Sequence, residues 1–229
     1  MSNILVAGAS RGIGLGLVSH YVQAGHTVHA VARDLGRAAE LRELAARHPE
    51  RLVLIESDIT DPAIVARVRT SLGGNKLDRL IVNAGIKQPD APNYLEVSPA
   101  DTARLFATNA LAPVGLAQGL ADALADGGVA AFLSSQMGSV ALARSARIPL
   151  YGASKAALNS LLQSWAAQMG TLRFAVLALH PGWVRTDMGG DAADIGVDES
   201  VQGLAHTIEA YAGRPACAFV DYRNETLAW

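Results

Sequence analysis

The sequence is poor in charged residues and in cysteine. Asp, Glu, Lys and Arg make up 17% of its 229 residues, and the formal net charge is −2. This balance offers no electrostatic basis for binding nucleic acid or an anionic membrane surface. A single cysteine, Cys217, excludes an internal disulfide and favours a reducing compartment.

Long apolar segments and metal-ligand clusters are also missing. No uninterrupted apolar run approaches the roughly 20 residues that span a bilayer, and the first residues lack a basic leader followed by an apolar region and a cleavage site. His, Cys, Asp and Glu nowhere recur at the spacing of metal ligands. We therefore expect a cytoplasmic protein with no metal site and no membrane or nucleic-acid partner.

The sequence does contain a regular alternation of apolar strands and amphipathic helices. Hydrophobic residues make up 50% of the chain, enough for one sizeable core. Short apolar runs predict seven strands, at residues 4–7, 27–32, 51–56, 78–82, 129–133, 173–179 and 216–220. Because helical segments separate them, we predict a doubly wound, mostly parallel α/β sheet with helices on both faces, in a single domain over residues 1–229.

A glycine-rich turn follows the first predicted strand and precedes a helix. Gly8 allows a tight turn, Gly12 lets the backbone approach a pyrophosphate, and Gly14 lets the helix pack closely on the strand. The helix N-terminus adds free N–H donors and partial positive charge. We therefore predict a dinucleotide-phosphate cradle, although such turns also occur for packing reasons alone.

The end of the second predicted strand bears on the choice of cofactor. Arg33 lies about twenty residues after the glycines, where a dinucleotide fold meets the adenosine ribose. Together with Arg11 in the glycine turn, it favours a 2′-phosphate and therefore NADP(H) over NAD(H). In the alternative, both arginines are solvated and Asp34 binds the ribose. We expect Asp34 instead to cap a helix over residues 35–48.

Tyr151 and Lys155 stand four residues apart in a predicted helix that ends near Gly170, so they share one helical face. A positive charge near a phenol lowers its pKa from about 10. A phenol tuned in this way exchanges protons with an alcohol or carbonyl oxygen near neutral pH. On these residues alone, a surface pair without a role is the simpler interpretation.

Other polar or small residues follow predicted strands, at the edge where open α/β sheets bind ligands. Asp58 and Ile59 follow the third strand, and Asn83-Ala84-Gly85 follows the fourth. Asn109 lies inside a predicted helix four residues before Pro113, which has no N–H to bond the Asn109 carbonyl. The freed carbonyl either binds water or marks a harmless kink.

These motifs, in this order, resemble the short-chain dehydrogenase/reductase family over nearly the whole chain. The resemblance extends to Pro181-Gly182 with Thr186, on the nicotinamide side. The serine segment 134–139, the segment 181–190 and the Leu-Ala-Trp ending are similar to the C-factor and sniffer group of carbonyl reductases. The resemblance implies a Rossmann-type fold and an NADP-dependent oxidoreductase acting on a ketone, aldehyde or secondary alcohol.

The resemblance also implies a catalytic role for individual residues. Tyr151 would protonate the carbonyl oxygen, while Lys155 would lower the pKa of Tyr151 and bind the nicotinamide ribose. Asn109 would hold a water in a proton relay from Lys155. The implied cofactor-binding residues are Gly8, Ser10, Arg11, Gly12, Ile13, Gly14, Arg33, Asp58, Ile59, Asn83, Ala84, Gly85, Tyr151, Lys155, Pro181, Gly182, Val184 and Thr186.

Three serines compete to stabilise the substrate oxygen as negative charge develops on it. They are Ser134, Ser135 and Ser139. We favour Ser135 because Gly138 follows it by three residues, as in the family pattern.

The sequence says less about which residues contact the substrate. Loop residues Tyr94, Met137, Trp183 and Met188 would form an apolar pocket, or each would pack within its own loop. Residues 187–198 are rich in Gly and Asp and predict a mobile lid.

The resemblance further implies a homodimer, because family members often pair through the helices that carry the Asn and the Tyr. Leu116, Leu120, Leu161 and Trp165 would serve that interface or the core equally well. Two alternatives to an enzyme stay open: a nucleotide-binding sensor and a signalling protein of the same fold. Such proteins are free to lose the tyrosine or the lysine, and this chain has both.

Overall fold

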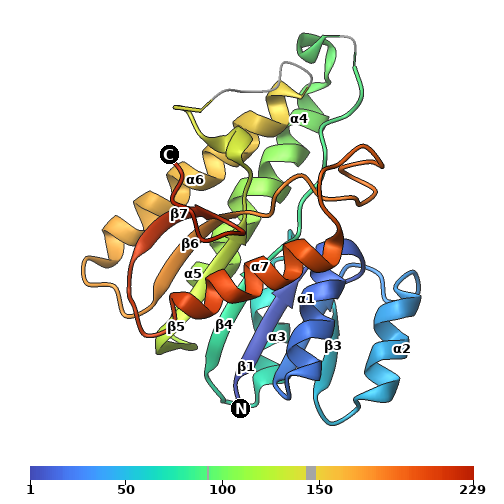
Figure 1. Ribbon diagram of the computed structural model, residues 1–229, viewed down its shortest axis with the longest axis vertical. Coiled ribbons are helices and arrows are strands. Elements are labelled where there is room, and N and C mark those ends of the chain that lie inside the picture. The colour runs from blue at the N-terminus through green and yellow to red at the C-terminus, as the bar shows by residue number, and fades with distance from the viewer. Residues whose placement is uncertain (92, 143–147) are drawn as a thin grey trace.

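A seven-stranded sheet forms the centre of the computed structural model, which describes residues 1–91, 93–142 and 148–229. The strand order is β3-β2-β1-β4-β5-β6-β7, and all six neighbouring pairs are parallel. The strands are β1 (Asn3–Ala7), β2 (Thr27–Ala32), β3 (Leu52–Glu56), β4 (Leu77–Val82), β5 (Leu124–Leu133), β6 (Ala175–His180) and β7 (Cys217–Asp221). The predicted doubly wound sheet is confirmed (Figure 1).

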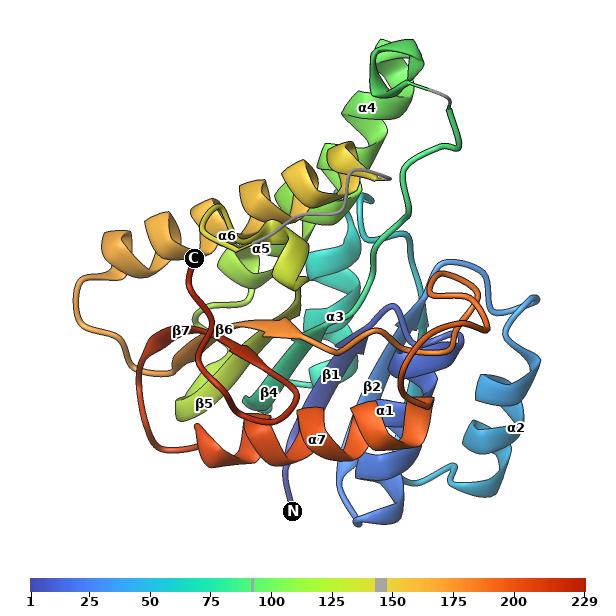
Figure 2. The same cartoon turned by 45° about the horizontal axis from the view of Figure 1, so that its top comes forward.

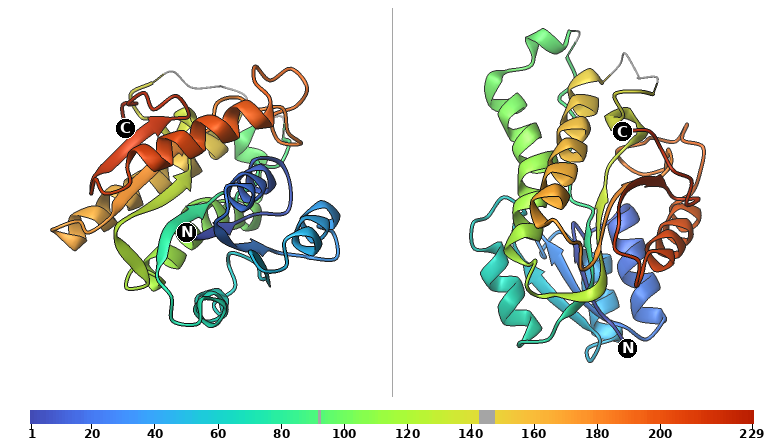
Figure 3. Two further views of the ribbon diagram at one scale, coloured as in Figure 1. Left: turned by 60° about the horizontal axis from the view of Figure 1, so that its bottom comes forward. Right: turned by 90° about the vertical axis from the view of Figure 1, so that its left-hand side faces the viewer.

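Helices cover both faces of the sheet. They are α1 (Gly12–Gln23), α2 (Ala39–Arg47), α3 (Ile64–Leu72), α4 (Pro99–Phe106), α5 (Ala112–Gly119), α6 (Pro149–Met169) and α7 (Val197–Ala210). Buried residues of α1, α2 and α7 share one core cluster, and those of α3, α5 and α6 share the other. Figure 3 shows α1 and α7 on one side of the sheet and α5 and α6 on the opposite side.

The two clusters explain why the strands read as continuous apolar runs. Successive strand residues point to opposite faces. In β1, Ile4 and Val6 enter the cluster beneath α1 and α7, whereas Leu5 and Ala7 enter the cluster beneath α3, α5 and α6. Both faces are therefore buried, as expected for a parallel sheet between two helical layers. Among the described residues, no helix is long and apolar enough to cross a membrane.

Two predicted boundaries differ from the structure by four residues or more. The helix predicted over residues 35–48 begins at Ala39. Asp34 caps the turn ahead of it instead, because Asp34 Oδ1 accepts the N–H of Arg37 at 3.1 Å. Strand β5 begins at Leu124, before the predicted residue 129, because Leu124 pairs with Leu77 ahead of a register irregularity.

The residues considered for a dimer interface lie mostly in the core. Leu116, Leu120 and Trp165 are between 0% and 5% exposed. Leu161 is partly buried and packs against the same cluster. These side chains pack the layer of α5 and α6 against the sheet. The homodimer therefore stays a prediction, and its interface would have to use other residues.

Candidate active site

The predicted site residues gather at the carboxyl end of the parallel sheet. The loops after β1, β2, β3, β4, β5 and β6 all leave the strands at this edge (Figure 2). A parallel sheet brings such loops together from distant parts of the sequence, and a doubly wound fold binds ligands there.

The first turn at this edge has the close packing of a phosphate cradle. Gly8 has φ +90°, and a Cβ added to it would lie 2.5 Å from the backbone N of Ala84. A Cβ on Gly14 would overlap the carbonyl oxygen of Gly8. Asn83 Nδ2 donates to that same carbonyl at 2.7 Å. The turn after β4 thus holds the glycine turn in shape at the N-terminus of α1, a position that favours an anion.

A π-helical segment interrupts the long helix opened by Ser98. This segment, η2 (Ala107–Leu111), lies between α4 and α5 and contains Asn109. Pro113 follows closely and lacks a backbone donor, so a regular α-helix cannot continue through this point. The predicted break in the helix is therefore present as a π turn.

The Asn109 side chain is fully buried and held in one orientation. Its Oδ1 accepts the N–H of Ile86 at 2.8 Å, and its Nδ2 donates to the carbonyl of Ile86 at 2.9 Å. Nδ2 also donates to Ser154 Oγ at 3.0 Å. Ser154 in turn donates to the carbonyl of Tyr151 at 2.7 Å. Asn109 is thus coupled to the loop after β4 and to the first turns of α6.

Three of the predicted motifs converge on Gly85. A Cβ added to Gly85 would lie 3.3 Å from Asn109 Oδ1 and 3.5 Å from Lys155 Nζ. The loop after β4, the π segment and α6 therefore meet in close contact at Gly85. This contact places Asn109 and Lys155 together, although they lie 46 positions apart in the sequence.

Tyr151 and Lys155 share one face of α6, as predicted. Lys155 Nζ lies 5.8 Å from the centroid of the Tyr151 ring. The lysine is 3% exposed and donates to the carbonyl of Leu133, at the end of β5, at 2.7 Å. Burial lowers the pKa of Lys155 to about 8.

The predicted direction of the Tyr151 pKa is wrong for the protein on its own. Tyr151 is half-buried, and desolvation by the surrounding protein raises its pKa to about 12. The cost of desolvating a phenolate therefore exceeds the attraction of the nearby ammonium. The phenol is protonated at neutral pH.

The three candidate serines have different partners. Ser134 Oγ donates to Asn159 Oδ1 at 2.6 Å within the core. Ser139 Oγ accepts the N–H groups of Ala141 and Leu142. Ser135 Oγ accepts only the N–H of Met137 at 3.1 Å in the described structure, so its own proton is available.

Ser135 also begins the short helix η3 (Gln136–Gly138), which packs against the Tyr151–Lys155 turn. A Cβ on Gly138 would lie 2.8 Å from the backbone carbon of Lys155. A Cβ on Gly152 would lie 3.0 Å from the carbonyl of Met137. Two glycines thus let the serine segment and α6 touch through their backbones.

The adenosine side of the edge contains the predicted Arg33 and Asp58. Arg33 is exposed at the end of β2. Burial alone would raise the pKa of Asp58, but hydrogen bonds from Thr60 and the charge of nearby Arg33 hold that pKa below its usual value. Asp58 is therefore ionised at neutral pH and lies within the field of the arginine.

The loop after β6 lies over the glycine turn. A Cβ on Gly12 would lie 3.4 Å from Thr186 Cγ2. Arg11 Nη1 and Asp187 Oδ2 form an ion pair at 2.8 Å. The predicted lid over residues 187–198 forms turns and an isolated bridge at Ile195, and its last residues belong to α7 from Val197 onward. Its mobility stays a prediction.

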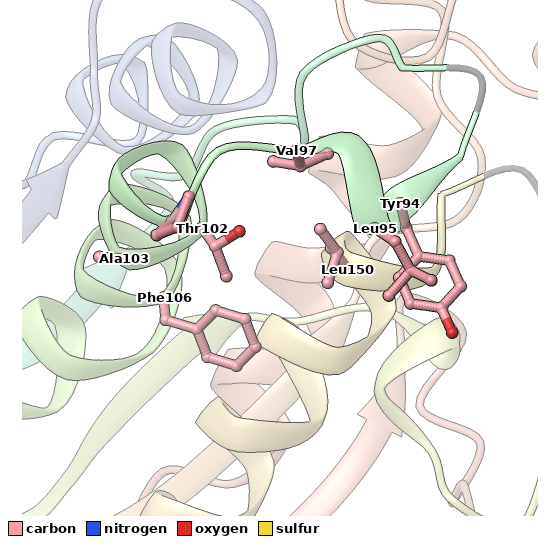
Figure 4. A pocket seen from close by; sticks show the side chains of 8 residues that line it. Tyr94, Leu95, Val97, Thr102, Ala103, Phe106 and Leu150 are labelled. Atoms are coloured by element: carbon pink, nitrogen blue, oxygen red, sulfur yellow. The ribbon is translucent and has the colours of Figure 1, made fainter.

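The cavity formed by described residues contains one of the four predicted substrate residues, and the apolar substrate pocket stays a prediction. An open, mostly apolar groove of about 550 Å³ includes Tyr94 but none of the other three (Figure 4). Its lining residues are Tyr94, Leu95, Val97, Pro99, Thr102, Ala103, Phe106 and Leu150. Trp183 and Met188 are 50% and 45% exposed. Leu150 connects this groove to Tyr151, its neighbour in the sequence.

Sequence reasoning missed Ser154 and Ile86. Ser154 precedes Lys155 directly and lies three residues after Tyr151, so helical spacing alone indicates that it is close to both. Ile86 offered no comparable signal, because it acts through its backbone groups. Within the described ranges, no three His, Cys, Asp or Glu side chains are placed to hold a metal ion.

The cradle at the first turn, the Gly85 convergence and the paired Tyr151 and Lys155 lie together at the carboxyl end of the sheet, where a dinucleotide-dependent oxidoreductase of this fold would hold its cofactor. The family model of the short-chain dehydrogenases matches residues 2–194, and the chain belongs to this family.

Three similar proteins show which members of the family the chain resembles. A carbonyl reductase from Pseudomonas aeruginosa in complex with NADP is 48% identical, with all of both chains covered and a TM-score of 0.93. The carbonyl reductase Sniffer of D. melanogaster is 29% identical, also with all of both chains covered, and has a TM-score of 0.88. C-signal from Myxococcus xanthus is 33% identical over 70% of this chain and 97% of its own. The predicted resemblance is confirmed.

Proposed function

We propose that the protein is an NADP(H)-dependent carbonyl reductase in which Tyr151 exchanges a proton with the substrate oxygen. The observation that carries this proposal is the convergence of Asn109 and Lys155 on Gly85, one helical turn from Tyr151. A carbonyl group presented to that turn would lie close to an acid, an ammonium and the Ser135 hydroxyl. Its substrate class is a ketone, an aldehyde or a secondary alcohol.

The chain's own residues supply the proton and the charge stabilisation. Tyr151 is a neutral phenol in the free protein, which suits a general acid during reduction. Ser135 donates to the same oxygen as negative charge develops on it. Lys155 is mostly protonated below its pKa of about 8, and its charge stabilises the phenolate left on Tyr151. Asn109 holds a water that returns a proton through Lys155.

The cofactor, when bound, supplies the hydride. Its phosphates fit the cradle formed by Gly8, Gly12 and Gly14, where an added Cβ would meet backbone atoms at two of the three positions. Arg33 and Arg11 would bind the 2′-phosphate, and Asp58 would contact the adenine. The NADP complex of the Pseudomonas aeruginosa relative supports binding of NADP(H), and the two arginines favour it over NAD(H).

The test is NADPH oxidation with a panel of ketones and aldehydes, using the wild-type protein and Tyr151→Phe. We expect turnover with at least one carbonyl compound. Tyr151→Phe should lower kcat by about 10²- to 10⁴-fold while the Kd for NADPH changes little, because the phenol acts in proton transfer. Tyr211→Phe, at the end of α7, is the matched control and should retain activity.

The similarity to C-signal supports a second candidate, a sensor or signalling protein of the same fold with little turnover. The second candidate would be supported if NADP(H) bound to the protein while no compound in the panel was reduced. A partner captured equally well by the wild-type protein and by Tyr151→Phe would support it further. We also propose that the protein is a cytoplasmic homodimer. Light scattering that shows a monomer at micromolar concentration would disprove the dimer.

A further inference from the structure

The ion pair between Arg11 and Asp187 joins the glycine turn to the loop after β6. Arg11 immediately precedes α1, and Asp187 follows Thr186. The Nη1 and Oδ2 atoms are 2.8 Å apart, and the two side chains are 77% and 73% exposed. Because neither side chain is buried, the pair can separate without disturbing the core.

Hydrogen bonds within the loop fix the position of Asp187 independently of Arg11. Gly190 N donates to the carbonyl of Thr186 at 2.8 Å, and Gly189 N donates to Thr186 Oγ1 at 3.2 Å. Trp183 Nε1 donates to the carbonyl of Gly189 at 2.9 Å. These bonds close a compact turn that presents the Asp187 carboxylate to the start of α1.

Asp187 therefore offers Arg11 the same chemistry as a phosphate would. A guanidinium forms charge-assisted hydrogen bonds with either anion. The proposed function assigns Arg11 to the adenosine 2′-phosphate, so one guanidinium faces two competing anions. NAD(H) has a hydroxyl group in place of that phosphate and does not compete.

We propose that Asp187 is a specificity-determining residue, because its carboxylate competes with the 2′-phosphate of NADP(H) for Arg11. NADP(H) has to take Arg11 from Asp187, whereas NAD(H) leaves the ion pair intact. NADP(H) binding therefore breaks the ion pair that joins the loop after β6 to the glycine turn. This inference rests on the proposed function, since it requires a dinucleotide in the cradle.

Calorimetric titration of NADP⁺ and NAD⁺ into Asp187→Asn tests the competition. We expect the variant to bind NADP⁺ about two- to five-fold more tightly than the wild type, the range that an exposed ion pair supports. Its Kd for NAD⁺ should not change. Asp191→Asn is the matched control, because Asp191 is exposed in the same loop and forms no ion pair within the described residues.

A double variant separates competition from a general charge effect. Arg11→Gln should weaken NADP⁺ binding, and adding Asp187→Asn to it should bring no further gain, because the contested guanidinium is gone. Weaker NADP⁺ binding by Asp187→Asn would overturn the inference, since it would mean that Asp187 holds Arg11 in place for the phosphate. An equal gain in Asp191→Asn, or an equal gain for NAD⁺, would overturn it as well.

The proposed function and this inference fail in different ways. If the wild type binds NADP⁺ and Tyr151→Phe loses turnover, but Asp187→Asn has an unchanged Kd, only the competition is disproved. If the wild type binds neither dinucleotide, the proposed function falls and the inference falls with it.

Discussion

Two regions near the site differ in how tightly their side chains are packed. One surrounds Tyr151 and Lys155, and the other consists of the loops that carry Trp183 and Met188. Lys155 and Asn109 are 3% and 0% exposed, and their polar atoms have protein partners. Trp183 and Met188 are 50% and 45% exposed. The first region is held in one arrangement by packing, whereas the second is not. This contrast suggests that the chemistry is fixed by the fold and that substrate choice depends on less constrained side chains.

The most damaging way to break the tightly packed region is to add a methyl group to the cradle. Gly14→Ala would place a Cβ into the carbonyl oxygen of Gly8 and 2.6 Å from Asn83 Nδ2. Because the backbone of Gly8, in the turn directly after β1, cannot move aside cheaply, we expect a loss of about 3 kcal/mol in the free energy of unfolding. NADP⁺ binding should be lost with it. Chemical denaturation and calorimetry measure the two effects.

Gly115→Ala is the control for this prediction. Gly115 lies in α5, and a Cβ there would meet no atom within 4 Å. Alanine should leave stability unchanged or raise it by up to about 1 kcal/mol, because it favours the helix. Equal stability of the Gly14→Ala and Gly115→Ala variants would contradict the close packing described for the first turn.

Removing the buried ammonium of Lys155 should lower activity while it raises stability. Lys155→Met is expected to lower kcat by at least about 100-fold, because the phenolate loses its counter-charge. The same change should raise the free energy of unfolding at pH 7 by about 1–3 kcal/mol, because a buried ammonium is costly. The lost hydrogen bond to the Leu133 carbonyl offsets part of that gain.

The pH dependence of this stability difference has a defined sign. Burial lowers the pKa of Lys155 from 10.5 to about 8, so folding disfavours its charged form. The destabilisation is fully present below pH 8 and disappears as the pH rises towards 10.5, where the unfolded lysine also loses its proton. The wild type and Lys155→Met should therefore converge in stability over that range. Lys87→Met, at an exposed position, should show no such trend.

The smallest effects should come from the exposed loops. Trp183→Ala and Met188→Ala are each expected to change kcat/KM by about 10-fold or less, by amounts that differ among carbonyl substrates, because a hydrophobic contact discriminates weakly. Steady-state kinetics over the panel measures this. A loss of kcat as large as that of Tyr151→Phe, and equal for all substrates, would mean that these residues act in the chemical step. It would contradict the division between a fixed catalytic region and adaptable loops.

Local spacing in the sequence was enough to predict the elements that carry the site. The glycine turn needs only a strand, three glycines and a helix, and the Tyr151–Lys155 pair needs only one turn of helix. The proline at residue 113 predicted the break in the helix that the structure shows as a π turn. Each of these features depends on neighbours within a few residues.

Features that depend on tertiary packing could not be predicted in the same way. The direction of the Tyr151 pKa follows from burial, which spacing does not reveal. The ion pair of Arg11 with Asp187 joins residues from opposite parts of the chain. Leu116 and Leu120 fitted an interface and a core equally well until the sheet beneath them was known.

The most direct test of the central claim is a titration of the Tyr151 phenol by ultraviolet absorbance, with and without NADP⁺. Subtracting the spectrum of Tyr151→Phe isolates this tyrosine from the others. We expect no Tyr151 phenolate in the free protein up to about pH 10. When the positively charged NADP⁺ is bound, the pKa of Tyr151 should fall by at least about two pH units. In Lys155→Met, the titration with NADP⁺ should move back to higher pH. Identical titrations with and without NADP⁺ would contradict the claim that this phenol exchanges its proton beside the nicotinamide.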